Sequence, residues 1–240
     1  ATDVADVFST YLYTGNNSTQ TITNGIDLDG EGGLTWIKGR TAGYGHNLYD
    51  TERGATNSLA SSSTDTNAVK SDGLTAFNSN GFSLGSSGSH NTSGQDYASF
   101  TFRKKSGFFD CVTWTGNGVA GREISHGLNG PVGMMVVKNT SHARSWTVFH
   151  KSLGATKYVY LNTQDPAGTY TPFWNDTAPT DTAFTLGINE NVNGNGNTYV
   201  AYLWADNSSE DAEEQMIKCG SYTGNGSATG PVVDLGWEPQ

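Results

Sequence analysis

Residues 199–204 read Tyr199-Val200-Ala201-Tyr202-Leu203-Trp204, a run of aromatic and aliphatic side chains. Runs rich in β-branched and aromatic residues are typical of β-strands packed in a sheet. A similar run, Tyr97-Ala98-Ser99-Phe100-Thr101-Phe102, stands 102 positions earlier. The two runs predict one strand that occurs twice in a duplicated unit.

Other blocks repeat in the same order at nearly the same spacing. Residues 35–38 match 135–138, residues 53–56 match 153–156, and residues 82–85 match 184–187. The sequence Thr-Gly-Asn, which we call the marker, occurs at residues 14–16, 115–117 and 223–225. The repeat is about a hundred residues long, which is the size of a small domain and too long for a solenoid repeat.

Composition favours an all-β fold. Of the 240 residues, 35% are hydrophobic and 31 are glycines, so short apolar runs alternate with turn-forming segments. We predict tandem antiparallel β-sandwich domains, with strands at residues 34–38, 146–149, 158–161 and 199–204. Residues 193–197, rich in Asn and Gly, predict a flexible hairpin loop between the runs at 184–187 and 199–202. The best helix candidate, residues 210–216, is equally compatible with a charged linker.

The repeat divides the chain into three parts. We expect a first sandwich at residues 1–107, a second at residues 108–209, and a linker with the start of a truncated third repeat at residues 210–240. Because the third copy stops just before a strand is expected, we also expect the chain to be a fragment of a longer polypeptide.

The charge balance argues against two classes of partner. Thirteen Lys and Arg stand against 23 Asp and Glu, which gives a net charge of −10. Nucleic-acid binding depends largely on neutralising phosphates, so DNA and RNA are not expected partners. An anionic membrane surface is disfavoured for the same reason. No apolar run approaches the roughly 20 residues that cross a bilayer, so membrane insertion is not expected either.

The two cysteines occupy the same position in successive repeats. Cys111 and Cys219 each lie three residues before the aromatic residue that precedes a marker. Equivalent positions about a domain apart are not expected to meet, so we predict no disulfide between them.

Sequence motifs of catalysis are missing. The chain has no Gly-x-Ser-x-Gly, no His-Glu-x-x-His, no phosphate-binding loop and no Cys-x-x-Cys. We therefore expect no enzyme activity, no cofactor, and no catalytic or metal-binding residues. The histidines lack metal-ligand spacing; they are His46, His90, His126, His142 and His150. His150 ends a predicted strand, but Asp50 stands at its place in the first unit, which favours a variable polar residue at a strand end.

Three acidic residues, Asp27, Asp29 and Glu31, supply the oxygen ligands that calcium prefers. The second unit has no acidic residue at the matching residues 127–130. Alternating acidic and apolar residues are also typical of a strand with one solvent-exposed face. The strand is therefore the favoured interpretation.

Sugar binding or cleavage could involve Asp176 beside Trp174, since glycosidases need carboxyl groups in a cleft. Core or turn packing is the favoured role for these two residues. We also expect core positions for four tryptophans that coincide with strands or repeat positions, namely Trp36, Trp114, Trp146 and Trp204. The marker Asn is expected to stabilise its own turn.

Taken in order, these blocks resemble a repeat domain of unknown function, concanavalin/laminin-G-like, found in structural and tail fibre-like proteins of marine bacteriophages. The resemblance is densest over residues 126–128, 135–138, 146–150, 152–156, 174–179 and 199–203. The first unit departs from it at residues 24–26 and in a Ser/Thr-rich insert at residues 58–71. The resemblance implies a jelly-roll or concanavalin-like sandwich and a role on the virion surface, and it implies no active site.

Three functions remain open from the sequence. The first is a bacteriophage structural protein, a surface fibre or appendage that contacts other virion proteins, self-associates as a fibre and attaches to a host-surface glycan. Repetition favours it, because weak contacts on one fibre add together. The second is a carbohydrate-binding module, free or attached to a glycan-degrading enzyme. The third, less favoured, is a polysaccharide depolymerase.

Overall fold

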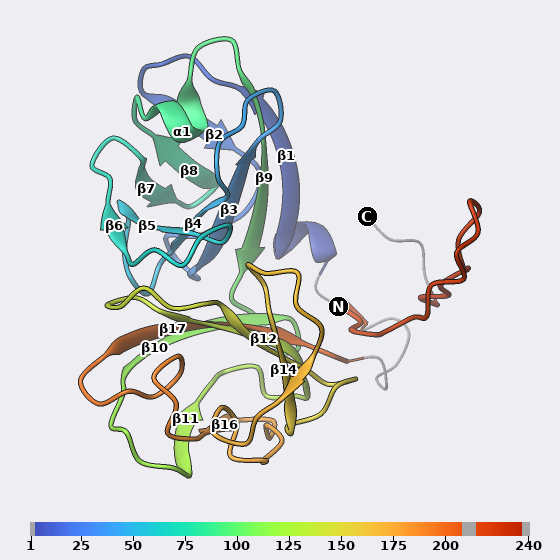
Figure 1. Ribbon diagram of the computed structural model, residues 1–240. Coiled ribbons are helices and arrows are strands. Elements are labelled where there is room, and N and C mark those ends of the chain that lie inside the picture. Colours follow the sequence, from blue (N-terminus) through green and yellow to red (C-terminus); the bar gives the residue numbers. More distant parts are fainter. Residues whose placement is uncertain (1–2, 208–214, 237–240) are drawn as a thin grey trace.

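The computed structural model describes residues 3–207 and 215–236 and is all-β, with antiparallel sheets (Figure 1). The first half, residues 3–107, contains the elements η1 (Val4–Asp6), β1 (Phe8–Thr14), β2 (Gln20–Thr23), β3 (Gly33–Gly39), β4 (Asn47–Asp50), β5 (Asn57–Ala60), β6 (Ala68–Val69), β7 (Leu74–Asn78), β8 (Gly81–Leu84), α1 (Gly88–Asn91) and β9 (Asp96–Arg103). The second half, residues 108–207, contains β10 (Phe109–Thr115), β11 (Arg122–Ser125), β12 (Val132–Asn139), β13 (Thr147–His150), β14 (Lys157–Tyr160), β15 (Gly168–Thr169), β16 (Ala183–Leu186) and β17 (Thr198–Ala205).

Each half is built on a six-stranded sheet, and corresponding strands have the same order in both. The first sheet runs β1-β9-β3-β4-β5-β6 and the second runs β10-β17-β12-β13-β14-β15. The registers correspond as well, because Tyr13 pairs with Tyr97 in one sheet and Trp114 with Tyr199 in the other. Both pairs of rings are stacked, with centroids 5.2 and 5.3 Å apart. The repeated sequence blocks therefore occupy repeated positions in the structure.

A smaller sheet packs on one face of each large sheet. In the first half it has the order β2-β8-β7, and in the second half it consists of β11 and β16. Buried residues of both sheets share a core in each half, with Phe82 in the first and Phe184 in the second. The second half has no strand at the place of β7; there Asn175 and Asp176 adopt left-handed backbone conformations, with φ near 54° and 50°.

A third core lies between the two halves. The opposite faces of the large sheets contribute to one buried cluster, with Leu34, Leu48 and Leu59 from the first half and Val136 and Tyr202 from the second. Figure 1 shows the first half lying directly on the large sheet of the second. The molecule is thus layered as small sheet, large sheet, large sheet and small sheet.

Tryptophans mark this middle layer. Trp146 is completely buried and Trp204 is 5% exposed, and both belong to the cluster between the halves. Trp114 lies in the core of the second half, as expected, while Trp36 is only partly buried and packs against the middle cluster. The expectation of core positions is confirmed for Trp114, Trp146 and Trp204, but two of these three stabilise the junction of the halves.

The predicted strands at residues 34–38, 146–149, 158–161 and 199–204 are confirmed within about one residue at each end. The hairpin predicted around residues 193–197 is wrong. β16 pairs with β11 and β17 pairs with β10 and β12, so these residues join two different sheets. Nor is the segment a free loop, because Asn193 is completely buried and donates to the carbonyls of Val119 and Gly187.

The marker forms the same turn in all three copies. The side-chain oxygen of its Asn accepts from the backbone N–H two residues later: Asn16 from Ser18, Asn117 from Val119 and Asn225 from Ser227, each at 2.9 Å. This local bond is the one expected of an Asn turn. In the two halves a buried Asn, Asn91 or Asn193, also accepts from the marker Asn N–H, so the turn is fixed to the rest of the half.

Residues 215–236 contain no strand and are mostly exposed. Met216 and Ile217 pack against the cluster between the halves, and the rest of the segment leaves the second half on the side of the N-terminus (Figure 1). The helix candidate at residues 210–216 falls largely outside the described residues, and residues 215 and 216 are not helical. Within the described ranges, no helix has the length and apolar character needed to cross a membrane.

Candidate functional site

A cleft of about 800 Å³ opens where the two large sheets meet. The first half contributes charged and amide side chains, and the second half contributes mostly hydroxyl groups. The lining residues are Glu52, Arg53, Asn57, Thr66 and Asn67 from the first half and Thr113, Trp114, Thr115, Thr140, Ser141, Thr198 and Tyr199 from the second. The volume is in the range of small-molecule sites, and the lining is rich in hydrogen-bonding groups.

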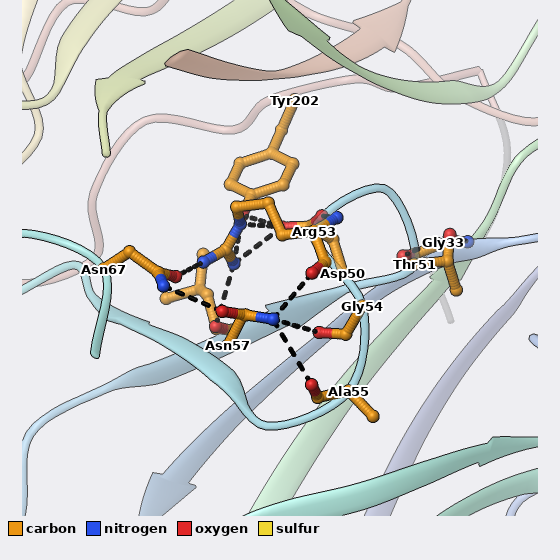
Figure 2. A network of polar contacts seen from close by, with 10 residues as sticks. Gly33, Asp50, Thr51, Arg53, Gly54, Ala55, Asn57, Asn67 and Tyr202 are labelled. Atoms are coloured by element: carbon orange, nitrogen blue, oxygen red, sulfur yellow. Dashed lines mark hydrogen bonds and ion pairs between the residues drawn. The ribbon is translucent and has the colours of Figure 1, made fainter. Parts of the chain in front are cut away.

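Arg53 lines the cleft, and its side chain joins a polar network that includes Tyr202 of the second half (Figure 2). Its Nε donates to Asp50 Oδ2 at 2.7 Å and its Nη1 donates to Asn67 Oδ1 at 2.6 Å. Its Nη2 donates to the Leu48 carbonyl and to the hydroxyl of Tyr202, both at 3.3 Å. The Tyr202 hydroxyl in turn donates to Asp50 Oδ2 at 2.7 Å. A side chain of the second half therefore completes a charged network of the first.

The local sequence positions this network. Asp50 ends β4, and its Oδ1 accepts from the backbone N–H of Arg53 at 2.9 Å, which closes the turn that follows the strand. Asn57 donates to the Arg53 carbonyl at 2.6 Å and accepts from Asn67 at 2.8 Å, so the turn is also fixed to β5 and its loop. The guanidinium is therefore positioned by several hydrogen bonds within the first half, besides its contact with Tyr202.

The charged groups of this network are buried away from water. The Asp50 carboxylate is fully buried and the Arg53 side chain is 8% exposed. Burial alone would lower the pKa of Arg53, but Tyr202 and Asp50 raise it above its ordinary value, so the guanidinium stays charged. Burial also raises the pKa of Tyr202 well above normal, so it remains a neutral hydroxyl that can donate to Asp50.

Three further polar contacts cross the junction beside the cleft. The Trp146 indole N–H donates to the carbonyls of Ala60 and Ser63, at 3.2 and 3.0 Å. Lys138 Nζ donates to the Thr64 carbonyl at 3.0 Å, and burial lowers its pKa to about 8, an effect that Asp65 partly opposes. These bonds hold the loop after β5 against the second half.

The histidines singled out in the sequence do not converge. His90 is completely buried and faces the hydroxyl of Tyr49, with 3.4 Å between Nε2 and the oxygen. Burial lowers its pKa to about 4, and Lys70 adds to this. Val192 stands at the matching place, directly before the buried Asn193, so His90 has a packing role.

His150 accepts from the backbone N–H of Ser152 through Nδ1 at 3.2 Å. Asp50 caps the matching turn of the first half, so the two residues do correspond, as the sequence suggested. His126 is 8% exposed and stacks on Phe184, and its Nδ1 accepts from the Leu128 N–H. It borders a second pocket, of about 520 Å³, together with Lys104 and Asp110.

The acidic candidates are not gathered either. Asp27 accepts from the Gly30 N–H at 2.8 Å within its own turn, while Asp29 and Glu31 are exposed. The strand expected over these acidic residues is wrong, because they lie in the turn between β2 and β3. Asp176 accepts from the Thr171 hydroxyl at 3.1 Å. Trp174 is 1% exposed and donates to the Lys157 carbonyl, so it presents no face to a sugar. Over residues 3–207 and 215–236, no three or more His, Cys, Asp or Glu residues are grouped as metal ligands would be.

Sequence reasoning missed the residues that matter most at the junction. The repeat indicates Asp50 only as the counterpart of His150, and Arg53 and Tyr202 only as members of repeated blocks. A departure from the repeat could have indicated these residues. Arg53 aligns with Leu153 of the second unit, and Tyr202 aligns with Phe100 of the first. Both cysteines are free thiols, with Cys111 buried in the middle cluster and Cys219 half-buried beside Asp206.

Fold and site together define an all-β protein of antiparallel sheets, in which two similarly ordered halves share a buried junction and a polar cleft. The chain belongs to a family described as a domain of unknown function (DUF7483), whose model matches residues 3–240. That single match covers both halves and the C-terminal segment. No curated protein and no solved structure matches the chain.

Proposed function

We propose that the chain is a surface structural module of a bacteriophage particle, part of a fibre or appendage that contributes to host attachment. In this proposal each half is a sandwich of the jelly-roll or concanavalin-like type, and the two repeat in tandem. The observation that carries it is the shared junction core, because a buried interface with a charged network makes two domains one stiff building block. The acidic, hydroxyl-rich composition suits a surface exposed to water.

The particle itself provides the test. Antibodies raised against the purified chain should label the outside of intact particles of the virus that encodes it, as seen by immunogold electron microscopy. Mass spectrometry of purified particles should recover the chain in a fixed ratio to a capsid protein. Recovery only from infected cells, with unlabelled particles, would refute the proposal.

A second candidate is a carbohydrate-binding module, and the cleft between the halves favours it. Hydroxyl groups of Thr113 and Thr115 and the amide of Asn57 line one continuous depression, which suits the hydroxyl groups of a sugar. Thr113 and Thr115 are exposed on the same face of β10, so a glycan could reach both.

Binding to a glycan array followed by calorimetry tests this second candidate. Thr115→Arg should abolish binding to any glycan that the wild-type chain retains, because the new side chain would fill the cleft. Thr21→Arg is the matched control, since Thr21 is an exposed strand threonine on the small sheet of the first half. Equal loss with both variants, or no retained glycan, would exclude the cleft as a sugar site.

A further inference from the structure

Asn-Gly dipeptides recur along the chain. In such a dipeptide the glycine nitrogen can attack the side-chain amide of the asparagine, because glycine has no Cβ to obstruct the approach. The attack requires the nitrogen to lose its proton and to turn toward the side chain. A folded chain can therefore protect or expose each dipeptide through the glycine N–H. There are seven of them, beginning at Asn24, Asn80, Asn117, Asn129, Asn193, Asn195 and Asn225.

In six of these dipeptides a hydrogen bond holds the glycine N–H, with donor–acceptor distances between 2.7 and 3.2 Å. Such a bond directs the nitrogen away from its own asparagine, so the chain must open locally before the reaction can start. The acceptors are the carbonyls of Ile26 for Gly81, Asn193 for Gly118, Asp181 for Gly130 and Gly116 for Gly196, the Tyr199 hydroxyl for Gly194, and the Asn80 side chain for Gly25.

Gly226, in the seventh dipeptide, is the exception. Among the residues that the structure describes, none accepts a hydrogen bond from its N–H. The glycine has a left-handed backbone, with φ near 68°, and open space around it. Exposure alone does not distinguish this dipeptide, because Asn117 and Gly118 are as exposed as Asn225 and Gly226. The free N–H does distinguish it.

The marker turn at Asn225 assists the attack. The side-chain oxygen of Asn225 accepts from the Ser227 N–H at 2.9 Å. Negative charge develops on this oxygen when the Gly226 nitrogen adds to Cγ. A backbone N–H that already points at the oxygen stabilises that charge.

The other two markers lack this combination. In the second, the Asn117 oxygen accepts from the Val119 N–H in the same way, but the Gly118 N–H donates to the Asn193 carbonyl at 2.8 Å. In the first marker, the residue that follows the Asn is Asn17 rather than glycine, and its N–H is also hydrogen-bonded. The three copies thus form a matched series in which one copy is reactive.

We propose that Asn225 deamidates spontaneously and that the folded chain confines this reaction to Asn225 among its Asn-Gly dipeptides. The Gly226 nitrogen gives its proton to hydroxide and bonds to Asn225 Cγ. The bond between Cγ and Nδ2 then breaks, and Nδ2 takes a proton from water and leaves as ammonia. The product is a five-membered succinimide.

One water molecule opens the succinimide in either of two ways. Breaking the bond between the Gly226 nitrogen and Cγ gives aspartate. Breaking the bond between that nitrogen and the main-chain carbonyl carbon of residue 225 gives isoaspartate. Both products add a negative charge at the third marker. Residues 221–229 are all exposed, so the two halves keep their structure. The inference is independent of the proposed virion role, since it concerns the isolated chain.

Incubation of the folded full chain at mildly alkaline pH, followed by peptide mapping with mass spectrometry, tests the proposal. Electron-based fragmentation distinguishes isoaspartate from aspartate. Isoaspartate should accumulate at Asn225 and form roughly tenfold or more slowly at Asn117, where the glycine N–H must first be freed. In urea that unfolds the chain the two sites should react at similar rates, because both read Thr-Gly-Asn-Gly.

Asn80→Ala should create a second reactive site. The Asn80 side chain is the acceptor that holds the Gly25 N–H at 2.8 Å, and the Asn24 oxygen already accepts from the Ile26 N–H at 3.2 Å. The variant should therefore deamidate at Asn24 as well as at Asn225. Circular dichroism checks that it folds.

Asn195→Ala is the matched control, because Asn195 is exposed and a main-chain carbonyl holds the N–H of the glycine that follows it. It should react at Asn225 alone, like the wild type. Equal isoaspartate at Asn117 and Asn225 in the folded chain would overturn the proposal. So would a folded chain that stays unmodified at Asn225, or a folded Asn80→Ala variant that does not react at Asn24.

Discussion

Two of the three marker glycines are held where a side chain does not fit. A Cβ at Gly15 would lie 2.2 Å from the Thr92 carbonyl oxygen, and one at Gly116 would lie 2.1 Å from that of Gly194. Neither glycine needs a left-handed backbone, so close approach to the neighbouring chain is what requires them. Gly224, in the third marker, has open space around it.

We therefore expect Gly15→Ala and Gly116→Ala to destabilise the fold by at least ~1–3 kcal/mol, because backbone must move to admit a methyl group. Gly224→Ala, the same change in the same motif, should stay within about 0.5 kcal/mol of the wild type. Urea unfolding followed by tryptophan fluorescence measures all three. Equal effects in the three copies would mean that the motif, rather than the contact, requires glycine.

His90 makes the first half sensitive to acid. Burial holds its pKa at about 4, below the value of about 6.5 expected in the unfolded chain. Between these values the unfolded chain binds the extra proton, so stability is fully present above pH ~6.5 and is lost as pH falls toward 4. The loss from this one group is on the order of 3 kcal/mol.

His90→Val, which copies Val192 of the second half, should flatten the dependence of unfolding free energy on pH between about 4 and 6.5. Denaturant titrations at a series of pH values measure this slope. Thr21→Asn is the control, because it exchanges one exposed uncharged side chain for another and should leave the slope unchanged. An unaltered slope in the His90 variant would contradict a buried neutral histidine.

At the scale of elements, the turn after β4 connects the halves through a buried ion pair. Removing one partner of such a pair leaves the other charge uncompensated, at a cost of ~3–5 kcal/mol. Arg53→Leu, which introduces the residue of the second half, should destabilise the chain by that amount because Asp50 remains. Thermal and urea unfolding give the value.

Arg144→Ala provides the comparison. Arg144 pairs with Glu190 at the surface, where the two side chains are 40% and 64% exposed. Exposed pairs contribute less than about 1 kcal/mol, so this variant should remain close to the wild type. If both variants cost the same, Arg53 would have no special part in joining the halves.

Strand positions were largely predictable from the sequence, and strand pairing was not. Tyr199 to Trp204 is a strand by composition alone, and its twin at residues 97–102 confirms the pattern. The failure at residues 193–197 arose because Gly and Asn indicate a turn without showing which sheets it connects. The buried side chain of Asn193 holds this part of the chain in place by donating to the carbonyls of Val119 and Gly187. The neighbouring sequence gives no indication that Asn193 is buried.

The junction escaped prediction for a related reason. The sequence predicts that an apolar residue such as Leu48 or Val148 is buried, but it does not show whether the residue lies inside one half or between the halves. In the second large sheet β17 is buried on both faces, at seven consecutive positions, so strict alternation is lost there. The cleft depends on which faces meet, and it could not be placed before the layers were known.

On the scale of the whole molecule, the middle core makes the two halves one cooperative structure. Trp146, Tyr202 and Trp204 belong to a cluster that includes residues of both halves, and Trp146 and Tyr202 also hydrogen-bond to the first half. Separation of the halves would expose these rings together with the pair formed by Asp50 and Arg53. Neither half can then unfold without destabilising the other.

Differential scanning calorimetry should accordingly show one transition, with equal calorimetric and van't Hoff enthalpies. Gly15→Ala lies in the first half and Gly116→Ala in the second, and each should shift that single transition downward. Two resolved transitions, with each variant moving a different one, would show that the halves unfold independently.

The long separation between Arg53 and Tyr202 has a consequence for synthesis. The two residues lie 149 positions apart, so the first half emerges from the ribosome well before the Tyr202 side chain that contacts Arg53. Domains made early begin to fold early, and exposed apolar surface at that stage promotes aggregation. Until Tyr202 is translated, the pair formed by Arg53 and Asp50 lacks the hydroxyl that completes it in the folded chain. We therefore expect this surface of the first half to stay open to water during synthesis.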